Sequence, residues 1–184
     1  MLTVYWNEYQ LEKKKKYLVY FTGNFSPPHK SHLARIEPYF NKKNVKILLH
    51  LWGNEKRHNI SIEKSFAILK IYLKGVDNVV IEKFDPLFTN IYNFKKLDYL
   101  IFIRGNENFN SSIKNDYLNT YSDLIKNLRK EGTTSIVLLK ERIPKNISST
   151  EMCKCINANT DDILQFLPEN LLEEEKNKIK EILI

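Results

Sequence analysis

Short apolar runs alternate along this chain with longer segments in which apolar residues recur at helical spacing. We predict strands at the five apolar runs with few polar positions: residues 16–22, 45–51, 78–84, 97–104 and 134–140. Helical spacing predicts helices at residues 32–40, 61–74, 87–94 and 111–130, and a tail that is helical from Pro168 to the end. Such alternation is typical of parallel strands joined by crossover helices. The pattern therefore predicts an α/β fold, with a Rossmann-like, doubly wound sheet of five parallel strands and a C-terminal helical segment.

The length of 184 residues is that of one domain. We expect residues 17–184 to form this domain and residues 1–16 to be an N-terminal extension. Polar residues interrupt the first sixteen positions, and no apolar run approaches the twenty residues or so that a membrane span needs. We therefore expect a cytoplasmic protein with no membrane partner.

Charge and cysteine content narrow the classes of partner. The chain has 29 Lys and Arg against 22 Asp and Glu, a formal net charge of +7, which favours anionic partners such as nucleotide phosphates or nucleic acid. It has no motif in which aromatic and basic residues interleave, so we do not expect a nucleic-acid partner. Cys153 and Cys155 are one residue apart, a spacing that suits neither a disulfide framework nor a zinc site, so reduced thiols are expected.

The stretch "TGNFSPPHKSH", residues 22–32, leaves the first predicted strand where ligands gather in open parallel sheets. Gly23 would let a ligand approach the backbone, two prolines would stiffen the turn, and His32 would open a helix whose amides attract anions. Imidazoles of His29 and His32 could donate hydrogen bonds to phosphate oxygens. The alternative is that one histidine caps the helix and the other is solvated.

Other segments along the chain strengthen the prediction that His29 and His32 bind phosphate oxygens. "NEKRHNISIEKSFAIL" follows the second strand, "IFIRG" ends the fourth, "ISSTEMCK" follows the fifth and "DDILQFLPENL" lies near the end. With "TGNFSPPHKSH" they resemble the nucleotidyltransferase superfamily and, more narrowly, bacterial phosphopantetheine adenylyltransferase, from Tyr17 to the C-terminus. Residues 1–16 have no counterpart in that family; an added edge strand, an oligomer contact and a disordered arm remain open for them.

The resemblance implies roles for particular residues. His32 corresponds to the catalytic histidine that stabilises the nucleotide phosphates, Lys56 to a lysine that steadies the acceptor phosphate, and Arg104 to an arginine of the acceptor and phosphate site. It also implies a nucleotide-binding set made of Thr22, Gly23, Asn24, Phe25, His29, His32, Arg104, Gly105, Ser148, Ser149, Thr150 and Lys154. No metal ligand is expected among the side chains.

The implied chemistry is an in-line attack by an acceptor oxygen on the α-phosphorus of ATP or another nucleoside triphosphate, with release of pyrophosphate. The partners are then the triphosphate, with Mg²⁺ bridging its oxygens, and a phosphorylated small-molecule acceptor, by default phosphopantetheine. The resemblance also implies a homo-oligomer.

Several residues depart from the family pattern. Asn24 replaces a threonine, Ser31 replaces the glycine before the second histidine, and Cys153 stands where the late motif has Arg or Lys. Lys154 and Glu107 reverse the charge found at two acceptor-side positions. Because unpaired buried charges are costly, nucleotide binding is the firmer prediction and the use of phosphopantetheine the weaker one.

Three alternatives stay open. A cytidylyltransferase or a nicotinamide mononucleotide adenylyltransferase would fit the His29-x-x-His32 pair at least as well. A nucleotide-binding regulator without turnover would fit Cys153, because a thiol supplies no fixed positive charge to a leaving pyrophosphate.

Overall fold

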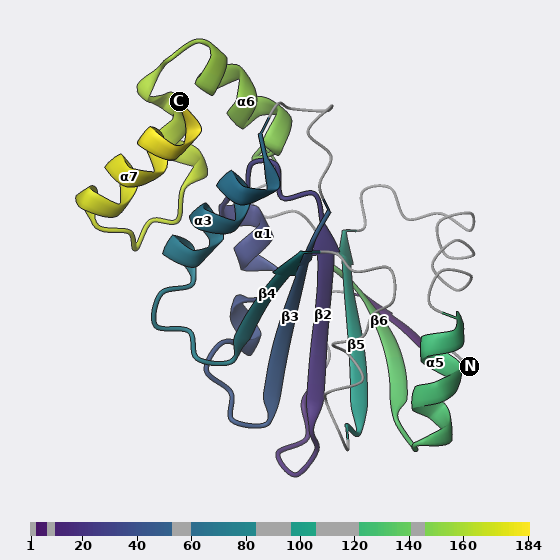
Figure 1. Cartoon of the computed structure of the whole chain (residues 1–184). Coiled ribbons are helices and arrows are strands. Elements are labelled where there is room, and N and C mark those ends of the chain that lie inside the picture. The colour runs from purple at the N-terminus through teal and green to yellow at the C-terminus, as the bar shows by residue number, and fades with distance from the viewer. Residues whose placement is uncertain (1–2, 7–9, 53–59, 84–96, 106–121, 141–145) are drawn as a thin grey trace.

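Six parallel strands form one sheet in the computed structural model of the chain (Figure 1). The structure describes residues 3–6, 10–52, 60–83, 97–105, 122–140 and 146–184. The strands are β1 (Thr3–Trp6), β2 (Tyr17–Gly23), β3 (Val45–Leu51), β4 (Val79–Lys83), β5 (Tyr99–Gly105) and β6 (Thr134–Lys140), in the order β1-β6-β5-β2-β3-β4. The α/β class, the parallel sheet and all five predicted strands are confirmed, with bounds shifted by at most two residues.

The sheet has one strand more than the five predicted. Strand β1 lies in the N-terminal extension and pairs in parallel with β6, with Thr3 opposite Ile136. A four-residue strand whose partner lies near the far end of the chain leaves no local signal beyond its β-branched and aromatic residues. Of the three roles left open for residues 1–16, the structure thus favours an edge strand.

Helices cover both faces of the sheet (Figure 1). They are α1 (Lys30–Ala34), the 3₁₀ turn η1 (Glu37–Tyr39), α3 (Ile62–Tyr72), α5 (Ser122–Lys130), α6 (Ser149–Asn157), the 3₁₀ helix η3 (Asp161–Phe166) and α7 (Glu173–Leu183). Val19, Phe21 and Leu49 belong to a core shared with α1, α3, α6 and α7. Leu18, Tyr20 and Leu48 point to the opposite face and pack in a second core with Ile125 and Leu128 of α5. Among the described residues, no helix is long and apolar enough to cross a membrane.

Three predicted helices have different bounds. Residues 32–40 were predicted as one helix, but α1 starts at Lys30 and stops at Ala34, because Pro38 has no N–H to donate to the Ala34 carbonyl oxygen. A separate 3₁₀ turn begins at Glu37 instead. The C-terminal helix begins at Glu173 rather than at Pro168. Helix α3 ends at Tyr72, two residues early, and Ser61 is its N-cap: Oγ accepts a hydrogen bond of 3.2 Å from the Lys64 amide.

Two helix predictions fall partly or wholly outside the described residues. The predicted helix at 87–94 lies outside them. The predicted helix at 111–130 is described only from Ser122, as α5.

Strand β2 is the point where the winding of the sheet reverses. It pairs with β3 on one side and β5 on the other, so Phe21 lies opposite both Leu49 and Ile103. The connection from β2 to β3 runs through α1 on one face, whereas the connection from β5 to β6 runs through α5 on the other (Figure 1). A crevice at the carboxyl end of such a strand is where open α/β sheets bind ligands.

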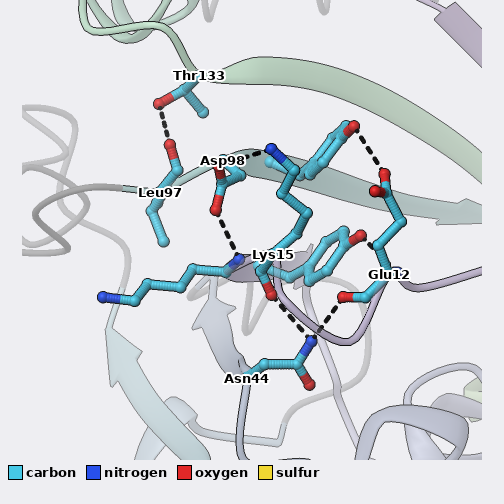
Figure 2. A network of polar contacts seen from close by, with 9 residues as sticks. Glu12, Lys15, Asn44, Leu97, Asp98 and Thr133 are labelled. Atoms are coloured by element: carbon cyan, nitrogen blue, oxygen red, sulfur yellow. Dashed lines mark hydrogen bonds and ion pairs between the residues drawn. The ribbon is translucent and has the colours of Figure 1, made fainter.

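At the other end of the strands, a polar network holds the segment that precedes β2 (Figure 2). The Asp98 carboxylate accepts hydrogen bonds from the Lys16 amide, at 2.8 Å, and from Lys15 Nζ, at 3.4 Å. The Asn44 amide group donates to the carbonyl oxygens of Glu12 and Lys15, at 3.2 and 2.9 Å. The described part of the extension is thus bonded to the connections that enter β3 and β5.

Candidate functional site

A polar cavity of about 300 Å³ lies where β2 ends, between the loop that leaves this strand and the start of α6. The described residues that line it are Asn24, Phe25, Ser26, His29, Ser31, His32, Arg35, Ser148, Ser149 and Thr150. They come from two segments that are far apart in the sequence. The predicted convergence of the first loop and the "ISST" segment in one pocket is therefore present in the fold.

Three hydrogen bonds hold the backbone of the first loop in place. Ser26 Oγ donates to the Ile60 carbonyl oxygen at 3.1 Å. Ser149 Oγ of α6 donates to Pro27 O at 3.0 Å, and the Tyr72 hydroxyl of α3 donates to Pro28 O at 3.2 Å. Burial raises the pKa of Tyr72, so its hydroxyl keeps its proton. The loop is thus positioned by three separate parts of the chain before any ligand binds.

His29 and His32 lie against each other at the entrance to α1. Their rings stack with centroids 3.8 Å apart and planes inclined by 23°. The His29 amide donates to His32 Nδ1 at 3.3 Å, so the neutral His32 ring carries its proton on Nε2. His29 is only 3% exposed, whereas His32 is partly exposed. In this tautomer, Nε2–H of His32 is a hydrogen-bond donor.

Phe25 supports His32 from the other side. Its ring packs edge-on against His32 with centroids 4.9 Å apart, and against Phe21 at 5.1 Å. Phe25 adopts a left-handed backbone conformation with φ of 45°, which is uncommon for a bulky residue and is often found at functional sites. We did not predict this supporting role, because nothing local in the sequence indicates a left-handed phenylalanine.

Gly23 precedes the cavity at the end of β2. Among the protein atoms, a Cβ added to it would meet only the Phe25 ring, at an ordinary contact distance of 3.5 Å. Its expected role, to let a ligand approach the backbone, stays a prediction.

Helix α6 presents its N-terminus to the cavity. Ser148 is its N-cap, and Ser148 Oγ accepts a hydrogen bond of 3.2 Å from the Glu151 amide. The first-turn amides of a helix lack intrahelical acceptors and attract anions. Among the described lining there is no carboxylate to oppose an anion. α1 adds little dipole of its own, because it has only five residues.

Cys153 and Lys154, at the end of the predicted nucleotide motif, do not line the cavity. Cys153 is 8% exposed in the core shared with α3 and α7, and burial raises the pKa of its thiol, so it stays neutral. Lys154 does not line the cavity; its Nζ pairs with the Glu151 carboxylate at 2.8 Å.

The remaining predicted residues lie on the other face of the sheet or outside the described residues. Side chains alternate along a strand, so Thr22 and Arg104 belong to the face of Tyr20 and Phe102, which α5 covers. They and Gly105 sit at the same carboxyl edge but do not line the cavity. Lys56 lies outside the described residues.

A polar cluster on this second face escaped prediction. His50, 1% exposed, lies between the Tyr20 hydroxyl, 2.9 Å from Nδ1, and the Glu82 carboxylate, 3.3 Å from Nε2. Beside it, Thr22 Oγ1 donates to His50 O at 3.2 Å and accepts from Trp52 Nε1. These residues come from β2, β3 and β4, which adjoin only in the folded sheet, and from Trp52, which directly follows β3.

Three residues that line the cavity were also not predicted: Ser26, Ser31 and Arg35. Arg35 follows His32 by three residues, and this spacing places two side chains on one side of a helix. That spacing was a signal in the sequence that could have identified Arg35.

The described residues hold no cluster of three or more His, Cys, Asp or Glu side chains arranged for a metal ion. The lining offers hydroxyls, imidazoles, a side-chain amide and a guanidinium, which suit phosphate oxygens better than a bare cation.

Solved structures with the same fold include two nucleotide adenylyltransferases. A putative nicotinate-nucleotide adenylyltransferase from Vibrio parahaemolyticus superposes with a TM-score of 0.58 at 16% identity, covering 91% of this chain and 98% of that one. The nicotinic acid mononucleotide adenylyltransferase of Plasmodium falciparum, complexed with NaAD, superposes with a TM-score of 0.57 at 12% identity, covering 91% of this chain and 94% of that one. At such identities the likeness shows a shared fold. No curated protein sequence matches the chain significantly.

The family model described as cytidylyltransferase-like matches residues 20–154, a span that runs from β2 to α6 and includes every described residue that lines the cavity. The chain is therefore a nucleotidyltransferase that belongs to the cytidylyltransferase-like family.

Proposed function

We propose that this enzyme transfers the AMP group of ATP to a phosphorylated small-molecule acceptor and releases pyrophosphate. The observation that carries the proposal is the cavity at the end of β2, where two histidines, one arginine, five hydroxyl side chains and the N-terminus of α6 face the same space. Imidazoles, a guanidinium, hydroxyls and helix amides are hydrogen-bond donors, so this set suits an anion, although the Ser26 and Ser149 hydroxyls donate to backbone carbonyl oxygens. A volume of about 300 Å³ is at the lower end of the range for small-molecule sites.

The mechanism needs no enzyme nucleophile. An acceptor oxygen forms a bond to the α-phosphorus while the bond to the pyrophosphate oxygen breaks, and the electron pair leaves with pyrophosphate. The chain's contribution is alignment and the stabilisation of spreading negative charge. Nε2–H of His32 would donate to a phosphate oxygen. The hydroxyls of Ser148 and Thr150 and the backbone amides of Ser149 and Thr150 would hold the triphosphate, because the Ser149 hydroxyl donates to Pro27 O.

We propose that Mg²⁺ enters with the triphosphate. The described lining has no carboxylate, so the phosphate oxygens would supply the ligands that this hard cation prefers. Its chemistry would be to neutralise charge on the triphosphate.

The acceptor would occupy the opposite face of the carboxyl edge, near Thr22 and Arg104. Nicotinate mononucleotide is the first acceptor to test, because the structural neighbours are named for nicotinate nucleotides and the His29-x-x-His32 pair fits them. Phosphopantetheine is the second, on the sequence resemblance alone. Homo-oligomerisation, also implied by that resemblance, stays a prediction.

The deciding experiment measures pyrophosphate release with ATP or CTP, Mg²⁺ and a panel of phosphorylated acceptors. We expect release with ATP and one acceptor. A strong preference for CTP would change the proposal to cytidylyl transfer. ATP binding without release from any acceptor would favour a regulator that lacks turnover.

A further inference from the structure

The described lining of the cavity contains a single permanently charged side chain, that of Arg35. The other lining residues are neutral hydroxyl, amide and phenyl side chains, or imidazoles whose charge depends on pH. A triphosphate carries several negative charges, and a leaving pyrophosphate gains more. The charge available from the described lining at neutral pH therefore depends on this guanidinium.

Helix α6 supplies no such cation from its described residues. The buried Cys153 thiol is neutral, because burial raises its pKa. The Lys154 side chain is 68% exposed and paired with Glu151, away from the lining. The helix thus contributes amides and hydroxyls, and the fixed charge has to come from another element.

Arg35 is placed by the way α1 ends. It is the C-cap residue of this helix, which Pro38 prevents from continuing, and it follows His32 by three residues. Arg35 is partly buried, so its charge is screened by salt less than the charge of a fully exposed arginine. A guanidinium offers donors in a fixed fork that fits two phosphate oxygens at once.

We propose that Arg35 binds the β- and γ-phosphates of the nucleotide through its guanidinium and offsets the charge of the leaving pyrophosphate. The assignment rests on the proposed function, and it moves the leaving-group cation from α6, where the resemblance would place it, to α1. Arg35 is then a substrate-binding residue that also favours the transition state.

The test compares Arg35→Gln and Arg35→Lys with the wild type, and with Arg129→Gln as a control for charge. Arg129 is an exposed arginine of α5, on the opposite face of the sheet. Isothermal titration with inorganic tripolyphosphate, ATP and AMP separates the phosphate tail from the rest of the nucleotide. Turnover is followed with the acceptor found active.

We expect Arg35→Gln to weaken tripolyphosphate and ATP binding at least tenfold and to leave AMP binding within about twofold. The value of kcat/KM should fall by about a hundredfold. Arg35→Lys should bind tripolyphosphate several-fold less tightly than the wild type, because it loses the fork but keeps the charge. Arg129→Gln should match the wild type throughout.

Unchanged tripolyphosphate affinity in either folded Arg35 variant would overturn the assignment, so Arg35→Lys decides the matter if Arg35→Gln does not fold. Failure of the proposed function looks different. Wild-type protein that binds tripolyphosphate through Arg35 but transfers nothing would refute transfer and keep the anion site. Wild-type protein that binds no polyphosphate would refute both.

Discussion

At the scale of single residues, the site depends on how His32 is held. The backbone bond to Nδ1, the stacked ring of His29 and the edge of Phe25 fix its tautomer and its orientation. This arrangement suits a group that donates one hydrogen bond to a phosphoryl oxygen, and it gives the ring little freedom to act as a mobile base.

We expect His32→Ala to lower kcat by about a hundredfold or more, because a preorganised donor to the transferring phosphoryl group is lost. The fold should change little, since His32 is partly exposed and lies at the edge of the core. Steady-state kinetics and a thermal melt check both parts. A variant with full turnover would remove His32 from the mechanism.

Two of the residues that matter here illustrate what a sequence can and cannot reveal. The spacing of His29 and His32 after a strand with a glycine predicts a phosphate loop, because this chemistry is local to one turn. For Arg35 the only signal in the sequence was its position three residues after His32, and its relevance depends on where α1 stops and on what α6 fails to supply. Those facts exist only in the folded chain.

At the scale of elements, the first loop is shaped by hydrogen bonds from residues outside the cavity. Tyr72 of α3 is the clearest case, since its hydroxyl reaches Pro28 O but the side chain does not line the site. It is a positioning residue.

Tyr72→Phe removes this one bond and keeps the ring. We expect a stability loss of about 1 kcal/mol, because Pro28 O loses a buried donor, and a three- to tenfold fall in kcat/KM as the loop loosens. Tyr39→Phe is a matched control, since Tyr39 is also a buried tyrosine and, among the described residues, no hydrogen bond joins its hydroxyl to the loop. Equal kinetics for the two variants would contradict the positioning role.

Asn78 joins elements in a similar way. Its side chain, 7% exposed, donates to Tyr39 O at 2.9 Å and Val45 O at 3.1 Å, and accepts from the Asn41 amide at 2.9 Å. We expect Asn78→Ala to lower the free energy of unfolding by about 2 kcal/mol, because several backbone groups lose their partner. Urea denaturation would show this loss, whereas Asn170→Ala, at an exposed position, should leave stability unchanged. A loss as small as that of the control would mean that water replaces the amide.

The elements were more predictable than their ends. Apolar runs predict the five strands from β2 to β6, because a strand buried on both faces, as β2, β3, β5 and β6 largely are, leaves few polar positions. The end of α1 at Ala34 depends on Pro38, which can be recognised in the sequence. The start of α7 at Glu173, five residues after the predicted start, has no such signal. Strand β1 was missed because its pairing with β6 is a long-range event.

At the scale of the whole molecule, the reversal of winding at β2 separates two sets of polar residues. The histidine pair and the α6 turn lie on one face of the carboxyl edge, and Thr22, Arg104 and the His50 cluster lie on the other. This division is consistent with the proposed transfer of AMP, in which the triphosphate on one face and the acceptor on the other would meet at the carboxyl end of β2.

The amino ends of the strands are fastened separately, around Asp98 (Figure 2). The hydrogen bond from the Lys16 amide, with a smaller contribution from Lys15, lowers the pKa of the Asp98 carboxyl. The hydrogen bond to Asp98 in turn raises the pKa of Lys15. A carboxyl with a lowered pKa stabilises the fold above its unfolded-state value and loses that effect as the pH falls through its folded-state value.

We therefore expect Asp98→Asn to be less stable than the wild type at neutral pH, and the difference to shrink as the pH falls below about 4, near the ordinary carboxyl pKa. The raised pKa of Lys15 predicts that the stability difference between the wild type and Asp98→Asn also shrinks at alkaline pH, as the lysine loses its proton. Urea unfolding at a series of pH values measures the difference, and Asp77→Asn, at an exposed site outside the network, should follow the wild type. A difference that stays constant from pH 7 to pH 3 would show that the carboxylate's charge does not hold the N-terminal segment. The attachment would then depend on the hydrogen bonds of Asn44 and the neutral groups around it.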